Sequence, residues 1–240
     1  MNRPNQLVIV GGGASIREGV EKGLWEKLEN QFVIGINFSY KFFPNATIQC
    51  YLDKQVREQN LEDFLKLDLV ITKLQPTKNH QNEIQIPTFS NYNRDIQKGI
   101  WKGSLTGIYA LTLGIYLLDE GEIFLLGYDF GDISGIKKPK EEKALTHFYQ
   151  GTFNHRGVGR VGYYNSKGHA DRDFSPFKEE KKVKIYNVSL NSKINVFEKI
   201  SYDEFFKKLD RNKYNQEELR RWIKASLPNP LPTKLKKNKK

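Results

Sequence analysis

The chain has 240 residues, of which 38% are hydrophobic, and its formal net charge at pH 7 is +11. This length and apolar content predict a globular protein with a sizeable α/β core, and they exclude a wholly disordered chain. No apolar run approaches the ~20 residues that cross a membrane, and no secretion signal is visible, so we expect a cytoplasmic protein. The single cysteine, Cys50, excludes an internal disulfide framework, and its apolar surroundings predict a buried, inert thiol.

Short apolar runs alternate with longer segments of mixed polarity, as repeated strand–helix units require. We expect strands at residues 7–10, 32–37, 47–52, 67–72, 83–86, 123–127 and 183–188. Their Val, Ile and Leu runs are typical of strands buried on both faces, which predicts a parallel sheet covered by helices. Helices are expected at residues 17–31, 105–121 and 201–213, and the second should lie in the centre because it is apolar nearly all round. The fold class is therefore a doubly wound, mainly parallel α/β sheet of Rossmann-like type.

Two regions interrupt this alternation. Residues 131–176 show no regular element and carry three of the four histidines, which indicates a functional insertion or lid before the last strand. Residues 228–240 are broken by prolines and hold five lysines but no acidic residue. We expect them to form a basic, disordered tail after a single nucleotide-binding domain at residues 1–227. The tail is either simply solvated or contacts nucleic acid or an anionic membrane surface.

The first expected strand runs into a glycine turn, "VGGGAS". Gly11, Gly12 and Gly13 lead into a helix, where backbone N–H groups and the helix dipole favour an anion such as phosphate, and Ser15 offers a further donor or a helix cap. The dinucleotide fingerprint requires a glycine where Ile16 stands, and no P-loop lysine follows, which disfavours NAD binding and P-loop ATP hydrolysis. The glycines alone fit a tight structural turn as well as a ligand site.

Polar residues follow three other apolar runs. Asn37 and Asp53 end the second and third expected strands, and Asp129 follows the run "FLLGYD". Ligands of doubly wound sheets bind beyond the carboxyl ends of the strands, so these side chains and the glycine turn predict a site on one rim. Each polar residue alone could equally cap the next helix. The segment "KGSLTG", residues 102–107, is a second possible anion cradle at the entry of a helix.

The order and spacing of these motifs resemble a superfamily with two known branches. One branch contains the bacterial lipo-oligosaccharide sialyltransferases, and the other contains the MptE-like hydroxymethylpterin diphosphokinase domains. The resemblance lies in "VGGGAS", "GINFSY", "YLD", "GSLTGIYALTLGIYLLDEGEIFLLGYDFG" and "KIYNVSLNSKINVFEKISYDEFF", which together span roughly residues 7 to 206. The entry of the long helix, the "GYDF" strand end and "NVSLNSKI" are its most specific parts.

In the sialyltransferase branch these motifs surround a cytidine nucleotide and a histidine acts as general base. The resemblance implies a nucleotide site made of Gly11, Gly12, Gly13, Ser15, Asn37, Asp53, Ser104, Thr106 and Gly127, with Asp129 and His169 as the catalytic residues. An imidazole with a pKa near its ordinary value of ~6.5 is suited to take a proton from an acceptor hydroxyl. His169 stands in "SKGHADRD", shortly before the last expected strand.

Other assignments of these residues stay open. His147 and His155 are alternative candidates for the general base, and by position alone His169 is typical of a surface residue. Asp171 and Asp173 offer a less favoured alternative as metal ligands, although no spacing matches a defined zinc site. The chain also departs from the sialyltransferases, because Gly131 replaces a tyrosine that steadies the departing phosphate and Gly103 replaces an arginine. The residues of the insertion that could replace them are Arg156, Arg160, Tyr163 and Tyr164.

These observations predict a glycosyltransferase-like enzyme that moves a sugar from a nucleotide-sugar donor, with a CMP-linked sugar as one candidate, to an acceptor hydroxyl with inversion. This reaction needs no metal cofactor. The alternative from the second branch is a diphosphokinase with Mg²⁺ held by Asp53 and Asp129. A third reading is a nucleic-acid-binding or DNA-modifying protein that uses the basic tail and "HRGVGRVGYY". The sequence is also compatible with three other properties: attachment to the inner face of a membrane through the tail, assembly into a homo-oligomer, and loss of catalytic activity with retention of binding.

Overall fold

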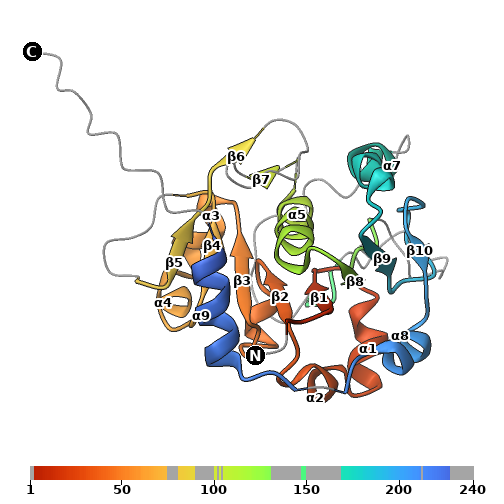
Figure 1. Cartoon of the computed structure of the whole chain (residues 1–240), viewed down its shortest axis with the longest axis horizontal. Coiled ribbons are helices and arrows are strands. Elements are labelled where there is room, and N and C mark those ends of the chain that lie inside the picture. The colour runs from red at the N-terminus through yellow and green to blue at the C-terminus, as the bar shows by residue number, and fades with distance from the viewer. Residues whose placement is uncertain are drawn as a thin grey trace, which may run out of the picture.

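A computed structural model describes residues 3–74, 81–89, 100–101, 103, 105–130, 147–149, 169–211 and 213–227. Its centre is an eight-stranded sheet in the order β10-β9-β8-β1-β2-β3-β4-β5, and all neighbouring strands are parallel (Figure 1). The strands are β1 (Gln6–Val10), β2 (Val33–Ile36), β3 (Ile48–Tyr51), β4 (Val70–Thr72), β5 (Glu83–Gln85), β8 (Gly121–Leu126), β9 (Val183–Asn187) and β10 (Glu198–Lys199). A separate parallel pair is formed by β6 (Thr88–Phe89) and β7 (Ile100–Trp101). The predicted Rossmann-like α/β fold is therefore confirmed.

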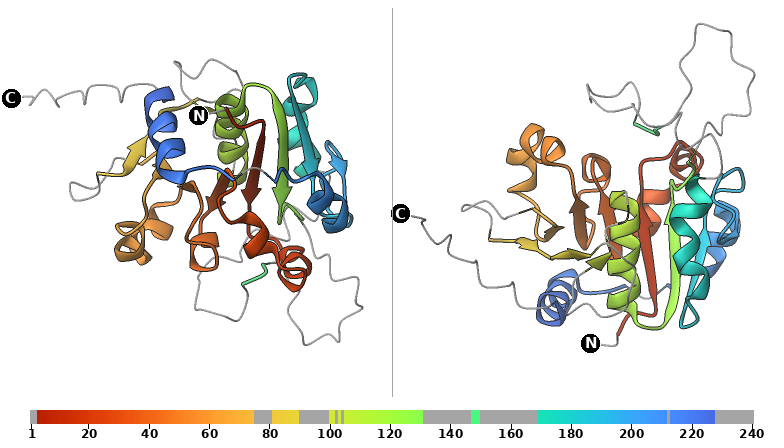
Figure 2. Two further views of the ribbon diagram at one scale, coloured as in Figure 1. Left: turned by 60° about the horizontal axis from the view of Figure 1, so that its bottom comes forward. Right: turned by 90° about the horizontal axis from the view of Figure 1, so that it is seen from above.

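Helices cover both faces of the sheet (Figure 2). They are α1 (Ile16–Glu21), α2 (Leu24–Leu28), α3 (Lys54–Gln59), α4 (Leu61–Phe64), α5 (Thr106–Leu118), α7 (His169–Phe174), α8 (Tyr202–Lys208) and α9 (Gln216–Ser226), with short 3-10 turns η1 (Ser39–Lys41) and η3 (Ser175–Glu179). Successive residues of β1 alternate between two cores, because side chains of a strand point to opposite faces. Leu7 and Ile9 pack in the core of α5 and α9, whereas Val8 and Val10 pack in the core of α1, α2 and α8. Burial on both faces explains the unbroken apolar runs of the sequence.

Helix α5 lies at the centre of the first core, as its sequence predicted. Eleven of its thirteen residues are buried. Its close approach to β1 requires Gly114, since a Cβ there would lie 2.6 Å from Leu7 Cδ2. Cys50 faces the same core and is fully buried, as expected, and burial raises the pKa of its thiol.

The strand order reverses next to β1. The chain passes from β1 through β2, β3 and β4 to β5 on one side, and then returns to pair β8 with the other edge of β1. Ligands of such sheets bind where the order reverses, at the carboxyl ends of the strands. We call the edge formed by these carboxyl ends the rim.

Several elements differ from the sequence-based expectation. The predicted helix over 17–31 is two helices, because Gly23 adopts a left-handed conformation with φ of +76° between α1 and α2. Strand β10 follows the expected last strand, so the insertion precedes two strands rather than one. Helices α3, α4 and α9 were not predicted as helices. Helices α3 and α4 carry too few turns for a periodic pattern, whereas the eleven residues of α9 place Leu219 and Ile223 on one apolar face, a signal that the sequence already contained.

The last part of the predicted insertion, residues 131–176, is not structureless. Helix α7 begins at His169 and continues into η3. Phe174 of α7 is fully buried, and its ring centroid lies 5.3 Å from that of Phe130 and 5.8 Å from that of Phe197. Most of residues 131–168 lie outside the described residues, so the prediction of a lid there stays a prediction.

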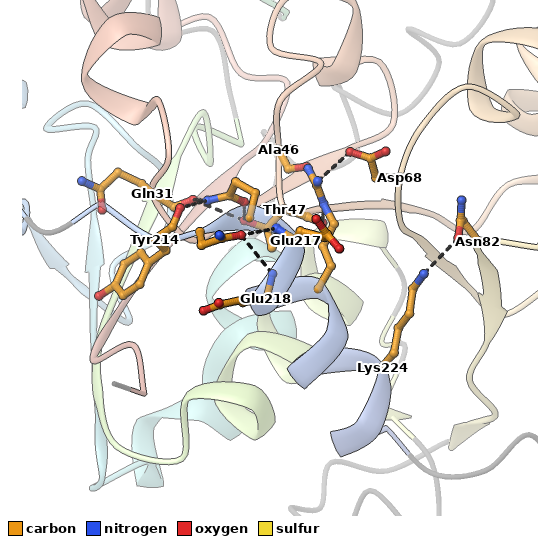
Figure 3. A network of polar contacts seen from close by, with 12 residues as sticks. Gln31, Ala46, Thr47, Asp68, Asn82, Tyr214, Glu217, Glu218 and Lys224 are labelled. Atoms are coloured by element: carbon orange, nitrogen blue, oxygen red, sulfur yellow. Dashed lines mark hydrogen bonds and ion pairs between the residues drawn. The ribbon is translucent and has the colours of Figure 1, made fainter. Parts of the chain in front are cut away.

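Helix α9 closes the first core at the amino ends of β2, β3 and β4 (Figure 3). Leu219 and Ile223 are fully buried, while Arg220 pairs with Asp68 at 2.6 Å and donates from Nε to the carbonyl of Thr47 at 3.2 Å. The apolar face of α9 is thus already used inside the protein and is not exposed toward a membrane. The tail at 228–240 lies outside the described residues. Among the helices that the structure describes, none combines the length and apolarity required to cross a bilayer.

Candidate functional site at the carboxyl ends of the strands

The structure brings most of the predicted site residues to the rim. The glycine turn follows β1, Asn37 follows β2, Asp53 follows β3 and Gly127 follows β8. Thr106 is the first residue of α5, whose other end leads directly into β8. Because all strands of the sheet are parallel, these positions share one edge. Ser104 lies outside the described residues, and only the backbone of His169 is described.

The glycine turn is bonded to the end of β8. The N–H of Gly11 donates to the carbonyl of Leu126 at 2.8 Å, and the N–H of Gly13 donates to that of Gly127 at 2.9 Å. A Cβ on Gly13 would lie 2.6 Å from the Gly127 carbonyl oxygen and would collide with the Asp129 carboxylate. Gly127 itself has φ of +68°. The glycines therefore allow two strand ends to approach closely, which is the structural alternative left open by the sequence.

Asp129 occupies the position where a phosphate was expected. The N–H of Ser15 donates to Oδ2 at 2.8 Å, its hydroxyl donates to Oδ1 at 2.5 Å, and the N–H of Ala14 also donates to this carboxylate. Asp129 is only 2% exposed, and burial raises the pKa of its carboxyl while the bonds from Ser15 and Ala14 oppose that shift. The start of α1 is thus neutralised by an anion of the protein itself, and Asp129 fixes the turn.

Asn37 offers an acceptor without a donor. Its backbone has φ of +52°; its N–H donates to the carbonyl of Cys50 at 2.9 Å, and its carbonyl accepts from Gln49 Nε2 at 2.9 Å. The side-chain Oδ1 is enclosed and has no hydrogen-bond partner among the described residues. A buried carbonyl oxygen left without a donor costs about 1–3 kcal/mol. If the side chain turns toward the rim, an N–H or O–H group of a ligand would remove this cost.

The first turn of α5 lies beside the glycine turn. Tyr128 joins the two: its ring lies 3.3 Å from where a Cβ of Gly11 would stand and its hydroxyl donates to the carbonyl of Gly107 at 3.0 Å. Leu105 precedes the helix and provides no side-chain cap for its N–H groups. Asp53 directly precedes α3 and is exposed, and its side chain does not cap the helix, contrary to the capping alternative.

Residues 147–149 lie directly against the glycine turn, which the sequence did not predict. His147 forms a β-bridge with Gly13, and the N–H of Phe148 donates to the carbonyl of Gly12 at 3.0 Å. A Cβ on Gly12 would lie 3.0 Å from both His147 Cδ2 and Tyr149 Oη. The run of three ring-bearing residues was the only signal of this contact in the sequence.

The acidic residues near His169 have structural partners. The Asp171 carboxylate accepts from the backbone N–H of Asn195 at 2.5 Å and from its Nδ2 at 3.0 Å, and Asp173 pairs with Arg172 at 3.0 Å. Within the described part of the chain, no three His, Cys, Asp or Glu side chains gather as a metal site would require. The other insertion residues considered above, Gly131, His155, Arg156, Arg160, Tyr163 and Tyr164, lie outside the described residues.

A cavity of about 580 Å³ lies at the opposite end of the sheet. Its lining includes Arg3 before β1, Asp119 before β8 and Lys182 before β9, together with Trp222 of α9. These are amino ends of strands, where parallel α/β sheets do not bind their ligands. We therefore place the candidate site at the rim.

In comparisons with known proteins, no family model, no curated protein and no solved structure matches this chain.

Proposed function

We propose that the chain binds a nucleotide at the rim and transfers a sugar from a nucleotide-sugar donor to an acceptor hydroxyl. The observation that carries the nucleotide part is the enclosed, unpartnered Oδ1 of Asn37 beside the point where the strand order reverses. Base and ribose groups carry the N–H and O–H donors that this oxygen lacks. The sugar-transfer part is supported by the motif resemblance stated from the sequence.

In this proposal the parts of the rim have separate roles. Asn37 orients the nucleotide, and the first turn of α5 at Thr106 and Gly107 faces its negative charge. His169, at the start of α7, is the proposed general base. Asp129 acts indirectly, because it holds the glycine turn in place rather than meeting the substrate.

The Asp129 contacts favour sugar transfer over the magnesium-dependent alternative. A diphosphokinase of the expected type would use Asp53 and Asp129 as metal ligands. Asp129 is only 2% exposed and both of its oxygens accept hydrogen bonds from Ser15, so little of this carboxylate is accessible to a metal. Of these two carboxylates, Asp53 is the one that is exposed and could bind Mg²⁺.

A thermal-shift experiment tests nucleotide binding. CMP, CDP, UDP, GDP and ATP are each added with and without Mg²⁺, and a ligand at ~100 times its Kd is expected to add ~2.7 kcal/mol of stability. We expect a sugar-carrier nucleotide, with CMP as the first candidate, to raise the melting temperature without metal. Stabilisation by ATP with Mg²⁺ alone would instead favour diphosphate transfer, and no shift with any nucleotide would overturn the proposal.

Replacing Asn37 by glycine tests the observation that carries the proposal. Asn37→Gly removes the amide but tolerates the positive φ, so the fold is expected to persist. We expect the affinity for the stabilising nucleotide to fall about tenfold, because a buried hydrogen bond is lost. Asn45→Gly, at an exposed position before the amino end of β3 and so away from the rim, is the control and should bind as the wild type does. Equal binding by Asn37→Gly would contradict the proposed role.

A further inference from the structure

The glycine turn cannot supply the usual charge for a phosphate. The N–H groups of Gly11 and Gly13 donate to carbonyls at the end of β8, and those of Ala14 and Ser15 donate to Asp129. Because these four N–H groups are already occupied, a phosphate near the turn needs donors from side chains as well. The structure places one ionisable ring directly on the turn, that of His147.

Two aromatic anchors hold His147 there. Phe148 is 7% exposed, and its ring centroid lies 4.8 Å from that of Phe42 and 6.2 Å from that of Trp25. Tyr149 is 5% exposed and packs edge-on against Phe38 at 5.8 Å. The backbone is fixed as well, because Arg17 Nε donates to the carbonyl of Phe148 at 3.1 Å. This segment is thus positioned before any ligand arrives, which favours binding.

Tyr149 also supports the imidazole ring itself. The ring centroids of His147 and Tyr149 are 5.1 Å apart with an interplanar angle of 34°. Gly12 allows both rings to reach the turn, since any side chain there would meet His147 Cδ2 and Tyr149 Oη at 3.0 Å. The middle glycine of "GGG" therefore makes room for this pair.

We propose that His147 donates an imidazole N–H to the phosphate of the bound nucleotide, with Tyr149 as its positioning residue. The inference rests on the proposed nucleotide site and adds a residue that compensates for Gly103 and Gly131, where the resembling sialyltransferases carry arginine and tyrosine. Its chemistry is a hydrogen bond to a phosphate oxygen, which strengthens when the imidazole is protonated.

Calorimetric titration with CMP and with cytidine, which lacks the phosphate, tests this inference on the full chain. We expect the wild type to bind CMP more tightly than cytidine, and His147→Gln to weaken CMP binding about tenfold without changing cytidine binding. His147→Lys restores a cationic donor and should recover the preference for CMP. Tyr149→Phe keeps the supporting ring and is expected to retain that preference.

The outcomes separate this inference from the proposed function. An unchanged ratio of CMP to cytidine affinity in His147→Gln would overturn the role of His147 while leaving the nucleotide site intact. Equal affinity of the wild type for CMP and cytidine would also overturn the role of His147 and leave the nucleotide site intact. If the wild type binds neither CMP nor cytidine nor any other nucleotide, both the role of His147 and the proposed nucleotide site would be overturned. Circular dichroism of each variant shows whether a loss of binding reflects unfolding.

Discussion

Gly13→Ala is expected to lower the free energy of unfolding by about 3 kcal/mol or more, because the new methyl group would clash with atoms that cannot move away. It would lie 2.6 Å from the Gly127 carbonyl oxygen and collide with the Asp129 carboxylate. The carbonyl is backbone and accepts the Gly13 N–H at 2.9 Å, so it cannot move away without loss of that bond. Asp129 is buried and held by Ser15, so it cannot move away easily either. Urea denaturation followed by circular dichroism measures the effect.

Gly12→Ala provides the matched comparison one residue earlier. Its Cβ would meet His147 Cδ2 and Tyr149 Oη at 3.0 Å, and both are side-chain atoms that can shift by a few tenths of an ångström. We therefore expect a cost of about 1 kcal/mol. If both variants lose the same stability, the close packing of Gly13 against Asp129 and Gly127 is not what the turn requires.

Asp129→Ala is expected to cost about 2–4 kcal/mol, because it leaves the N–H groups of Ala14 and Ser15 buried without an acceptor. Asp129→Asn should cost much less. Its amide oxygen can accept from the two backbone N–H groups, while its NH₂ group donates to the Ser15 hydroxyl. Equal losses in the two variants would show that the carboxylate is needed for its charge rather than for its acceptors.

Chemical rescue tests whether the start of α1 is an anion cradle filled by Asp129. Formate fits the space left by the removed carboxylate, so it should restore part of the stability of Asp129→Ala and leave the wild type unchanged. Formamide has a similar shape but no charge, and we expect it to restore less. Rescue by neither compound would show that the space closes after the substitution.

The pH dependence of stability follows from the same carboxyl group. Its pKa in the folded protein is raised above the ordinary value of 3.8, chiefly by burial. A raised pKa means that the folded state binds the proton more tightly, so this contribution to stability is complete below the unfolded pKa and is lost as pH rises through the folded one. Relative to Asp129→Asn, the wild type should therefore lose stability as pH increases from about 4 toward neutrality. Denaturation series of both proteins at several pH values measure the difference.

The sheet and the rim could be predicted from the sequence, because apolar runs such as "LVIV" and "FLL" report burial on both faces. Parallel pairing then places Asn37, Asp53 and Asp129 on one edge without further information. The meaning of the glycine turn could not be predicted in this way. A bound phosphate and an internal carboxylate satisfy the same N–H groups, and the carboxylate that does so lies 114 residues further along the chain.

The remaining differences also arise from contacts between distant residues. Helix α7 has six residues, too few to show a period, and its position depends on Phe174 against Phe130 and Phe197. His147 reaches the turn because Phe148 and Tyr149 find an aromatic core formed by residues 25–43. Local patterns do not encode such pairings, and His169 was favoured over His147 because of the family resemblance alone.

Because β1 pairs with β2 on one edge and with β8 on the other, its two edges are covered at different stages of synthesis. During synthesis β1 and β2 emerge early, but the other edge of β1 stays open until residue 126 has left the ribosome. The face later covered by α9 stays exposed longer still, until Leu219 and Ile223 appear. Pairings this distant slow folding. The nascent chain thus carries an open, apolar strand edge from the emergence of Val10 until that of Leu126, and this is the stage at which chaperone binding should matter most.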